Sequence, residues 1–462
     1  MKIISLHAED VHGYLPIDIE FFPDLTFLTG LNGSGKTTAL RLLMALLTPN
    51  MEEFSSTTFS RASVKVEYES NDVIVKASKS TEGLELSIDG VSEKLFLSSA
   101  ELELLSETRH REESKSPVHE KVLANSVFKA IRKMTTPMFL GLDRRSFVSN
   151  APWDDSDEAR RKEFLTRRIW MHDPSLRSST ATGLAEVNIL IADKMLEIHA
   201  AQETLDETLR RKLLTSAFEY KPSDITSYTK APSRLELERY RERLAHIERA
   251  AEGFRLPVPE LKTALSGFFE SLTNVVDALE KQAKDKKTKS KDKKGIQPEP
   301  NKNLLEWLFN KTQADGVLEH LKWLDQYGQD RSALREPIDR FVSLTNSFLE
   351  QTNKRVAVEG KGALHIFLQG SGTARPVSSL SSGERQLVVM LAHLSLNKNL
   401  AGSGVFIVDE PELSLHMDWQ ERFVAAIREA NPSVQLIMAT HSPAIILDRT
   451  ESCISLSGEY HD

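Results

Sequence analysis

The most informative stretch of this 462-residue chain is Gly30-Leu31-Asn32-Gly33-Ser34-Gly35-Lys36-Thr37. It fits the pattern G-x-x-x-x-G-K-[ST], and it stands between apolar runs at 25–28 and 38–47, which we expect to form a strand and a helix. Glycines let backbone N–H groups curl round phosphate oxygens, and the helix N-terminus adds the positive end of its dipole. This context favours a phosphate-binding loop over a glycine-rich turn that happens to end in Lys-Thr.

The loop predicts a site for a nucleoside triphosphate. In such a site Lys36 reaches the β- and γ-phosphates, and the Thr37 hydroxyl is a ligand for Mg²⁺. The candidate nucleotide-binding residues are Gly30, Asn32, Gly33, Ser34, Gly35, Lys36, Thr37 and Thr38.

A second part of the site is expected where the apolar run 405–408 ends in Asp409 and Glu410. A carboxylate at a strand end can hold Mg²⁺, which we assign to Asp409, and Glu410 can polarise the water that attacks the γ-phosphate. An apolar strand that ends in Asp-Glu is common by itself. Together with a phosphate loop, it provides the expected second half of a nucleotide site.

A third candidate segment opens the helix expected at 382–395. Its residues are Ser381, Ser382, Gly383 and Glu384. Serine and glycine at a helix N-terminus can present hydrogen-bond donors to an anion, but they are also ordinary capping residues. Both interpretations of this segment stay open.

His441 follows the strand expected at 435–439, within Ala439-Thr440-His441-Ser442-Pro443. A single histidine is usually structural. At the end of a strand beside a nucleotide site, it could instead contact the γ-phosphate and take part in catalysis.

In their order along the chain, the four segments resemble the ATP-binding-cassette superfamily, with its phosphate loop, signature sequence, Walker B strand and switch histidine. The long stretch between the loop and the signature is similar to SMC, Rad50 and RecF-type ATPases, not to transporters. The segment Glu410-Pro411-Glu412-Leu413-Ser414-Leu415-His416, with Trp419-Gln420, resembles the bacterial AAA-21 branch. That branch includes the ATPase half of overcoming-lysogenization-defect (OLD) nucleases and the stand-alone ATPases of Septu, PARIS and retron-linked anti-phage systems.

The resemblance implies an α/β fold, a two-lobed ATPase head with a helical, short coiled-coil-like insertion. The lobes are expected at 1–154 and 335–462, and the insertion at 155–334. ATP and Mg²⁺ are the implied cofactors, with Glu410 and His441 as catalytic residues. Two chains would pair head to tail, or form a larger homo-oligomer, with each signature completing the partner's phosphate site.

The sequence departs from the resemblance in two ways. No Gln precedes Gln202, so the glutamine that helps to hold Mg²⁺ in such ATPases is missing. Asp143 and Arg144, which follow the apolar run 138–142, are either its candidate replacement or simply a charged turn. Only 21 residues follow His441, so we expect no nuclease module in this chain. We therefore expect a sensor or regulatory scaffold for a separate HNH or Toprim nuclease. The alternative is an ATPase that acts on DNA in recombination or repair.

The middle of the chain has helical patterns and one strongly basic run. Apolar spacing predicts a helix at 184–217, and the capping box of Ser233 and Glu236 predicts a second helix that ends at Gly253, packed antiparallel to the first. Residues 281–294 contain eight Lys and two Asp. They are expected to form a solvated, disordered loop extending to about residue 300, or else a flexible arm that contacts nucleic acid.

Composition limits the class of protein. The net charge is −8, no apolar run approaches the length of a membrane helix, and the N-terminal sequence MKIISLHAEDVHGY lacks the apolar core of a signal peptide. Cys453 is the one cysteine, so an internal disulfide and a cysteine metal site are both excluded. We expect a cytoplasmic protein with no membrane partner.

Overall fold

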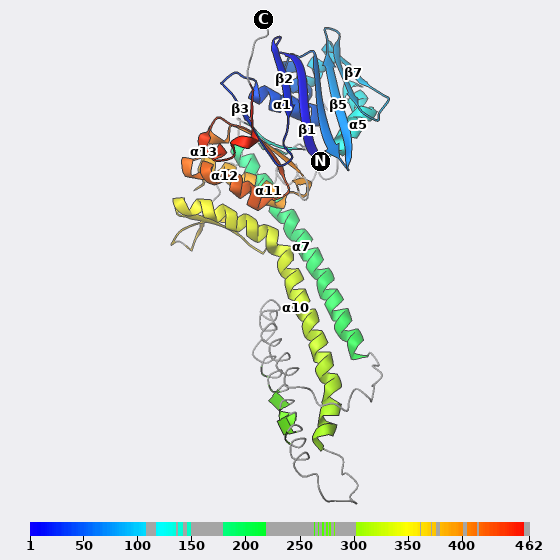
Figure 1. Cartoon of the computed structure of the whole chain (residues 1–462), viewed down its shortest axis with the longest axis vertical. Helices are drawn as coiled ribbons and strands as arrows, with labels where there is room; N and C mark the ends of the chain where they lie inside the picture. The colour runs from blue at the N-terminus through cyan, green and yellow to red at the C-terminus, as the bar shows by residue number, and fades with distance from the viewer. Residues whose placement is uncertain are drawn as a thin grey trace, which may run out of the picture. The chain divides into compact units, whose positions relative to one another are not determined.

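The computed structural model of the chain describes residues 1–107, 117–134, 137–141, 146–148, 179–218, a few positions within 263–281, 302–360, 362–370, 372–375, 379–400, 404–413 and 415–456 (Figure 1). The chain divides into two compact units. One consists of Met1–Met195 with Pro337–Asp462, and the other of Leu196–Glu336. Helices and sheets alternate in the first unit, which confirms the α/β class predicted from the sequence.

An antiparallel sheet dominates the first hundred residues. Its strands are β1 (Lys2–Val11), β2 (Leu15–Glu20), β4 (Arg61–Tyr68), β5 (Asn71–Lys79), β6 (Gly83–Ile88) and β7 (Leu95–Ser98), paired in the order β2-β1-β4-β5-β6-β7. Burial alternates along β2, where Leu15, Ile17 and Ile19 face the core. Such alternation is typical of a sheet with one packed and one solvated face.

A second sheet joins the two ends of the chain. Its strands are β3 (Leu25–Thr29), β8 (Met138–Leu140), β9 (Ser146–Val148), β13 (Val405–Asp409), β14 (Gln435–Ala439) and β15 (Cys453–Ser455), in the order β15-β3-β14-β13-β8-β9. All neighbouring pairs are parallel except β8 and β9. Every residue of β13 and β14 is buried, which explains why their sequences are continuous apolar runs rather than alternating ones.

Helix α1 (Lys36–Leu47) packs between the two sheets, because it contacts β4 and β5 of the antiparallel sheet and β13 and β14 of the parallel sheet. Its apolar residues belong to one core with side chains from both sheets. The shorter helices that follow in this half are α2 (Met51–Ser56), α3 (Ser99–Glu107), α4 (Pro117–Ala124) and α5 (Ser126–Lys133). The position of α1 fixes the phosphate loop, since the helix begins at Lys36.

In its described residues, the C-terminal part of the first unit contains three further α-helices. These are α11 (Ser382–Leu396), α12 (Met417–Ala430) and α13 (Pro443–Ile446), with the short 3-10 helices η4 (Glu350–Thr352) and η7 (Pro411–Leu413) nearby in the chain. A small antiparallel sheet lies between η4 and α11 in the chain and is formed by β10 (Lys354–Val358), β11 (Leu364–Leu368) and β12 (Ala374–Arg375). The helix predicted at 382–395 is confirmed within one residue at each end.

Two long helices, α7 (Ser179–Ala217) and α10 (Lys302–Leu349), run into the second unit. Within that unit they are joined by a hydrogen bond between Ser216 Oγ and His320 Nε2, 2.7 Å long, and by one from the Tyr327 hydroxyl to Asp206. The helix predicted at 184–217 is confirmed as part of α7, whereas the sequence analysis did not predict α10.

Several predictions for the middle of the chain stay predictions. The helix expected at 233–253 and all of the lysine-rich run after Lys281 lie outside the described residues. The domain boundaries at 154/155 and 334/335 are likewise not decided, because the two compact units divide inside α7 after Met195 and inside α10 after Glu336. None of the helices in the described ranges is long and apolar enough to cross a membrane.

Candidate nucleotide-binding and catalytic site

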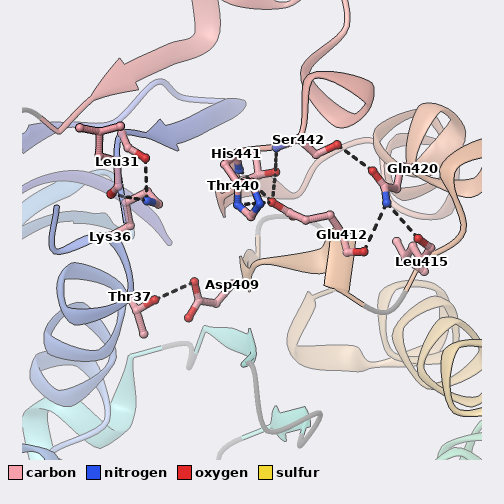
Figure 2. A network of polar contacts seen from close by, with 11 residues as sticks. Leu31, Lys36, Thr37, Asp409, Glu412, Leu415, Gln420, Thr440, His441 and Ser442 are labelled. Atoms are coloured by element: carbon pink, nitrogen blue, oxygen red, sulfur yellow. Dashed lines mark hydrogen bonds and ion pairs between the residues drawn. The ribbon is translucent and has the colours of Figure 1, made fainter. Parts of the chain in front are cut away.

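The candidate site lies at one edge of the parallel sheet. Strands β3, β14 and β13 are neighbours and run in the same direction, so the segments that follow them emerge at the same edge. The register aligns Ala439 with both Leu28 and Asp409. The carboxyl edge of such a sheet is where α/β proteins bind ligands. The phosphate loop, Asp409 and His441 therefore meet there, as Figure 2 shows.

The backbone of the phosphate loop depends on its glycines. Gly30 and Gly35 have backbone φ angles of 145° and 88°, which residues other than glycine rarely adopt. A Cβ atom at Gly30 would lie 2.6 Å from the carbonyl oxygen of Leu456 and 2.8 Å from Ser34 Oγ. Gly35 is the N-cap residue of α1, so its left-handed conformation turns the loop directly into the helix.

Lys36 holds the inside of this loop. Its buried ammonium group donates hydrogen bonds of 2.9 Å to the Gly30 carbonyl and 3.0 Å to the Leu31 carbonyl (Figure 2). Ser34 Oγ is buried beside Gly30 and has no hydrogen-bond partner among the residues that the structure describes. A loop with a positive charge, a helix N-terminus and an unpaired hydroxyl fits a chain of phosphates.

Thr37 and Asp409 form the second element of the site. Thr37 Oγ1 donates a hydrogen bond of 3.2 Å to Asp409 Oδ1, and Asp409 is only 4% exposed (Figure 2). Burial is the main reason that the pKa of Asp409 is raised to about 6, with the hydrogen bond from Thr37 opposing that shift and the charge of Glu410 adding to it.

This pair of oxygens fits Mg²⁺. The described residues contain no cluster of three or more metal-binding side chains. However, Mg²⁺ at nucleotide sites is usually held by one or two protein oxygens, and phosphates and water supply the rest. Thr37 and Asp409 provide a hydroxyl and a carboxylate of this kind, and the buried carboxylate of Asp409 is suited to a cation.

Glu410 occupies an unusual backbone conformation directly after β13. Its φ angle is 47°, in the left-handed region, and its N–H donates a hydrogen bond of 2.9 Å to the Ala439 carbonyl. Non-glycine residues are held in this region at a cost of about 1–3 kcal/mol, often at functional sites. The side chain is partly exposed, so water can reach it.

His441 is held by a glutamate that the sequence analysis did not assign. Glu412 Oε1 accepts hydrogen bonds from Thr440 Oγ1 at 2.9 Å and from the His441 N–H at 2.8 Å, and it lies 3.0 Å from His441 Nδ1 (Figure 2). Glu412 is 6% exposed, whereas His441 is 52% exposed. The only sequence signal for this role was the place of Glu412 in the segment 410–416.

Gln420 extends these contacts to α12. Its Nε2 donates to the Leu415 carbonyl at 2.9 Å and the Glu412 carbonyl at 3.3 Å. Its Oε1 accepts a hydrogen bond of 2.7 Å from Ser442 Oγ (Figure 2). One glutamine thus links the residues that follow β13 to those that follow β14, and the sequence analysis had no means of pairing it with Ser442.

The predicted signature segment has clear structural roles. Ser381 is the N-cap residue of α11 and forms a capping box with Glu384. The Glu384 carboxylate, 2% exposed, is bound by Lys354 Nζ at 2.8 Å and Thr352 Oγ1 at 2.7 Å. The capping interpretation of Ser381 is therefore correct for this chain, while a role for residues 381–384 in a partner's nucleotide site stays a prediction.

Three candidate residues remain, of which the structure places only Thr38. Asp143 and Arg144 lie outside the described residues. They follow β8, which pairs with β13 at the register Val408 to Leu140. Thr38 Oγ1 lies 3.4 Å from His12 Nε2, a contact with the turn between β1 and β2 that the sequence did not predict.

A phosphate loop and a buried aspartate, joined at the carboxyl edge of a parallel sheet, are typical of a nucleotide-binding domain of the phosphate-loop class. More particularly, the chain belongs to the family described as AAA domain, putative AbiEii toxin, type IV TA system, which matches residues 25–448.

The chain is also similar to two curated proteins. It is 26% identical over 140 residues to the retron Vc95 probable ATPase of Vibrio cholerae serotype O1 biovar El Tor, covering 28% of this chain and 26% of that protein. It is 28% identical over 142 residues to the retron Ec83 probable ATPase of Escherichia coli, covering 27% of this chain and 26% of that protein. The matched region spans about a quarter of the length of both relatives.

Solved structures with some similarity include Smc heads. The Smc head domain with a coiled coil and joint from Pyrococcus yayanosii has 12% identity and a TM-score of 0.37, covering 98% of this chain and 94% of that chain. The SmcHead bound to the C-winged helix domain of ScpA has 11% identity and a TM-score of 0.40, with the same coverage.

Proposed function

We propose that this chain binds Mg²⁺-ATP at residues 30–37 and hydrolyses it. The observation that carries the proposal is the hydrogen bond between Thr37 and Asp409, since it joins the phosphate loop to the carboxylate expected to serve Mg²⁺. The position of Lys36 Nζ inside the loop, where it donates to the Gly30 and Leu31 carbonyls, supports its proposed role at the β- and γ-phosphates. Membership of the AAA-domain family supports ATP as the nucleotide.

In the proposed reaction, Glu410 accepts a proton from the attacking water while Lys36 and His441 face the γ-phosphate. Bound Mg²⁺ would neutralise charge on the β- and γ-phosphate oxygens. The left-handed backbone at Glu410 supports its role as the base, because it turns the chain sharply just beyond Asp409. Glu412 is a poor candidate for that role, since it is buried and its Oε1 already faces three donor atoms.

We further propose that two copies pair head to tail, with the segment Ser381–Gly383 of one copy completing the nucleotide site of the other. The position of Ser381 at the N-terminus of α11 supports this arrangement, because a helix N-terminus can receive a phosphate. Ser382 and Gly383 are partly exposed, so they remain accessible to a partner's nucleotide.

The biological role that we propose is regulation of a separate nuclease, of HNH or Toprim type, in anti-phage defence in the cytoplasm. The similarity to two retron ATPases supports this role. ATP binding or hydrolysis would then change how the chain restrains or delivers the nuclease.

The experiment combines biochemistry with phage challenge. Purified wild-type protein should release phosphate from ATP only when Mg²⁺ is present, and Glu410→Gln should bind ATP without turnover. Cells that carry the gene with its genomic neighbours should resist phage, and Lys36→Ala should remove the resistance. ATPase activity that duplex DNA stimulates, with no nuclease copurifying and no phage resistance, would favour the alternative role in recombination or repair.

A further inference from the structure

The contacts of Glu412 extend the proposed site by one residue. This carboxylate comes from η7, which follows β13, and its Oε1 lies within hydrogen-bonding distance of three groups that follow β14. All three groups belong to Thr440 and His441. Glu412 is therefore a bridge between the segment that contains Glu410 and the segment that contains His441.

A direct part in the chemistry is excluded for Glu412 by its surroundings. Its Oε2 is buried, with no hydrogen-bond partner in the described part of the chain, so that oxygen does not reach water. Its Oε1 is occupied by the Thr440 hydroxyl, the His441 N–H and the His441 ring. A general base must lie within hydrogen-bond reach of the water that it activates.

The contact with His441 fixes one ring nitrogen. An ionised carboxylate can only accept hydrogen bonds, so the imidazole Nδ1, 3.0 Å away, carries the proton of that contact. The other nitrogen, Nε2, is then the one available for a ligand. The His441 side chain is 52% exposed, whereas the Glu412 carboxylate that contacts Nδ1 is buried. The Nδ1 edge of the imidazole is therefore held in place, while the rest of the ring stays accessible.

The backbone keeps the two segments in register. The Glu410 N–H donates to the Ala439 carbonyl at 2.9 Å, and the Leu413 N–H donates to the Glu410 carbonyl at 3.2 Å. The side chain of Glu412 adds its contacts to these backbone hydrogen bonds, and Gln420 Nε2, from α12, donates to the Glu412 carbonyl. The position of the His441 ring relative to Glu410 thus depends on one buried carboxylate.

We infer that Glu412 is a positioning residue for His441: it accepts from Nδ1–H and so leaves Nε2–H of the protonated imidazole to donate to a γ-phosphate oxygen. The inference rests on the proposed ATPase function, and it goes beyond it by naming the residue that orients the histidine. Partners that orient a functional histidine in this way are familiar from metal sites and from catalytic triads.

A set of variants tests how Glu412 affects the rate of ATP hydrolysis. Glu412→Leu removes the acceptor, Glu412→Gln keeps an acceptor without charge, and His441→Ala removes the ring; Glu421→Gln, on the exposed side of α12, is the matched control. We expect Glu412→Leu to lower kcat about 10–100-fold, the range seen for partners that orient a histidine ligand. Glu412→Gln should lose less, because its amide oxygen still accepts from Nδ1, and the control should match the wild type.

The double variant Glu412→Leu with His441→Ala separates positioning from general damage. If Glu412 acts through the ring, the double variant should be no slower than His441→Ala alone, and KM for ATP should change by less than about threefold in the single variants. A further loss of kcat in the double variant, equal to the loss in the wild-type background, would overturn the inference.

A spectroscopic measurement tests the inference without turnover. In protein labelled with ¹⁵N-histidine, the His441 signals, assigned by their absence in His441→Ala, should show a protonated Nδ1 in the wild type and loss of that preference in Glu412→Leu. The same tautomer in both proteins would refute the positioning role. If His441→Ala keeps full ATPase activity, the role proposed for the histidine fails, and the tautomer still decides whether Glu412 holds the ring.

Discussion

Thr37 and Asp409 are 372 residues apart in the sequence, yet Thr37 Oγ1 donates a hydrogen bond of 3.2 Å to Asp409 Oδ1. The contact follows from the order of the parallel sheet, in which β14 lies between β3 and β13. Because both ends of the chain contribute strands to this sheet, neither end can form the site alone.

Substitutions at Lys36 and Glu410 should separate nucleotide binding from turnover. Lys36→Ala should weaken ATP binding at least about 100-fold, because hydrogen bonds from a charged group to phosphate are worth about 1.5–3 kcal/mol each. Glu410→Gln should keep binding and lower kcat about 10²–10⁴-fold, since an amide accepts protons poorly. Fluorescent-nucleotide titration and phosphate release measure the two effects, with Lys212→Ala, exposed on α7, as the control. Normal turnover in Glu410→Gln would remove Glu410 from the catalytic role.

The sequence predicted the parts of this site that depend on local pattern. Strand β13 is a continuous apolar run because every one of its residues is buried, and the loop before α1 has glycines because its backbone angles require them. The pairing of Glu412 with His441 has no such local signal. It depends on β13 lying beside β14, which is a property of the sheet order and not of either segment.

Helix α10 was not predicted from the sequence, for a different reason. It runs from Lys302 to Leu349 and contains Pro337, a residue that normally ends or kinks a helix. Its hydrophobic periodicity is weak, so its pattern resembles a series of shorter segments. The sequence pattern therefore does not mark it as one helix.

Mixing two inactive variants tests the head-to-tail dimer. Lys36→Ala removes a chain's own nucleotide site, and Ser381→Arg blocks the signature that it offers to its partner. Each homodimer lacks both sites, but a mixed dimer regains about one working site, because the intact loop and the intact signature meet there. Phosphate release from mixtures at several ratios measures the recovery. Should mixed dimers be isolated and remain inactive, the arrangement is wrong.

Ser381→Arg also removes the N-cap hydroxyl of α11, so its stability needs its own control. Ser381→Ala should cost about 1 kcal/mol, the usual loss for an N-cap serine. A mixed dimer with Ser381→Ala in place of Ser381→Arg therefore shows how much of any loss comes from the helix end. Thermal unfolding of each variant measures that cost.

Deletion of the lysine-rich run should leave nucleic-acid binding unchanged. The eight lysines and two aspartates of residues 281–294 give a net charge of +6, and charge runs of this composition are usually solvated. A variant that joins Ala278 to Gly295 by a short Gly/Ser linker should bind duplex DNA and RNA like the wild type across a salt series. A weaker affinity with a shallower salt slope, at preserved ATPase activity, would instead identify a basic arm that contacts phosphates.

Loss of the buried ion pair at the signature helix should destabilise the protein in a pH-dependent way. Burial works to raise the pKa of Glu384, but hydrogen bonds from Lys354 and Thr352 outweigh it and lower the pKa below its ordinary value. Lys354, 18% exposed, is the cation of the pair, so Lys354→Met should cost about 3 kcal/mol near neutral pH. A lowered folded-state pKa adds stability above the ordinary glutamate pKa and loses it as the pH falls through the folded value.

The cost of Lys354→Met should therefore shrink below about pH 4, where the carboxyl group becomes protonated and needs no cation. Lys65→Met is the matched control, because Lys65 pairs with Asp72 at 2.7 Å on the exposed face of the antiparallel sheet. Its cost should stay under about 1 kcal/mol, as for surface pairs in general. Urea unfolding of both variants and the wild type at several pH values measures the difference. An equal cost for Lys354→Met at pH 7 and pH 3 would show that packing of the lysine stem, and not its charge, holds the start of α11.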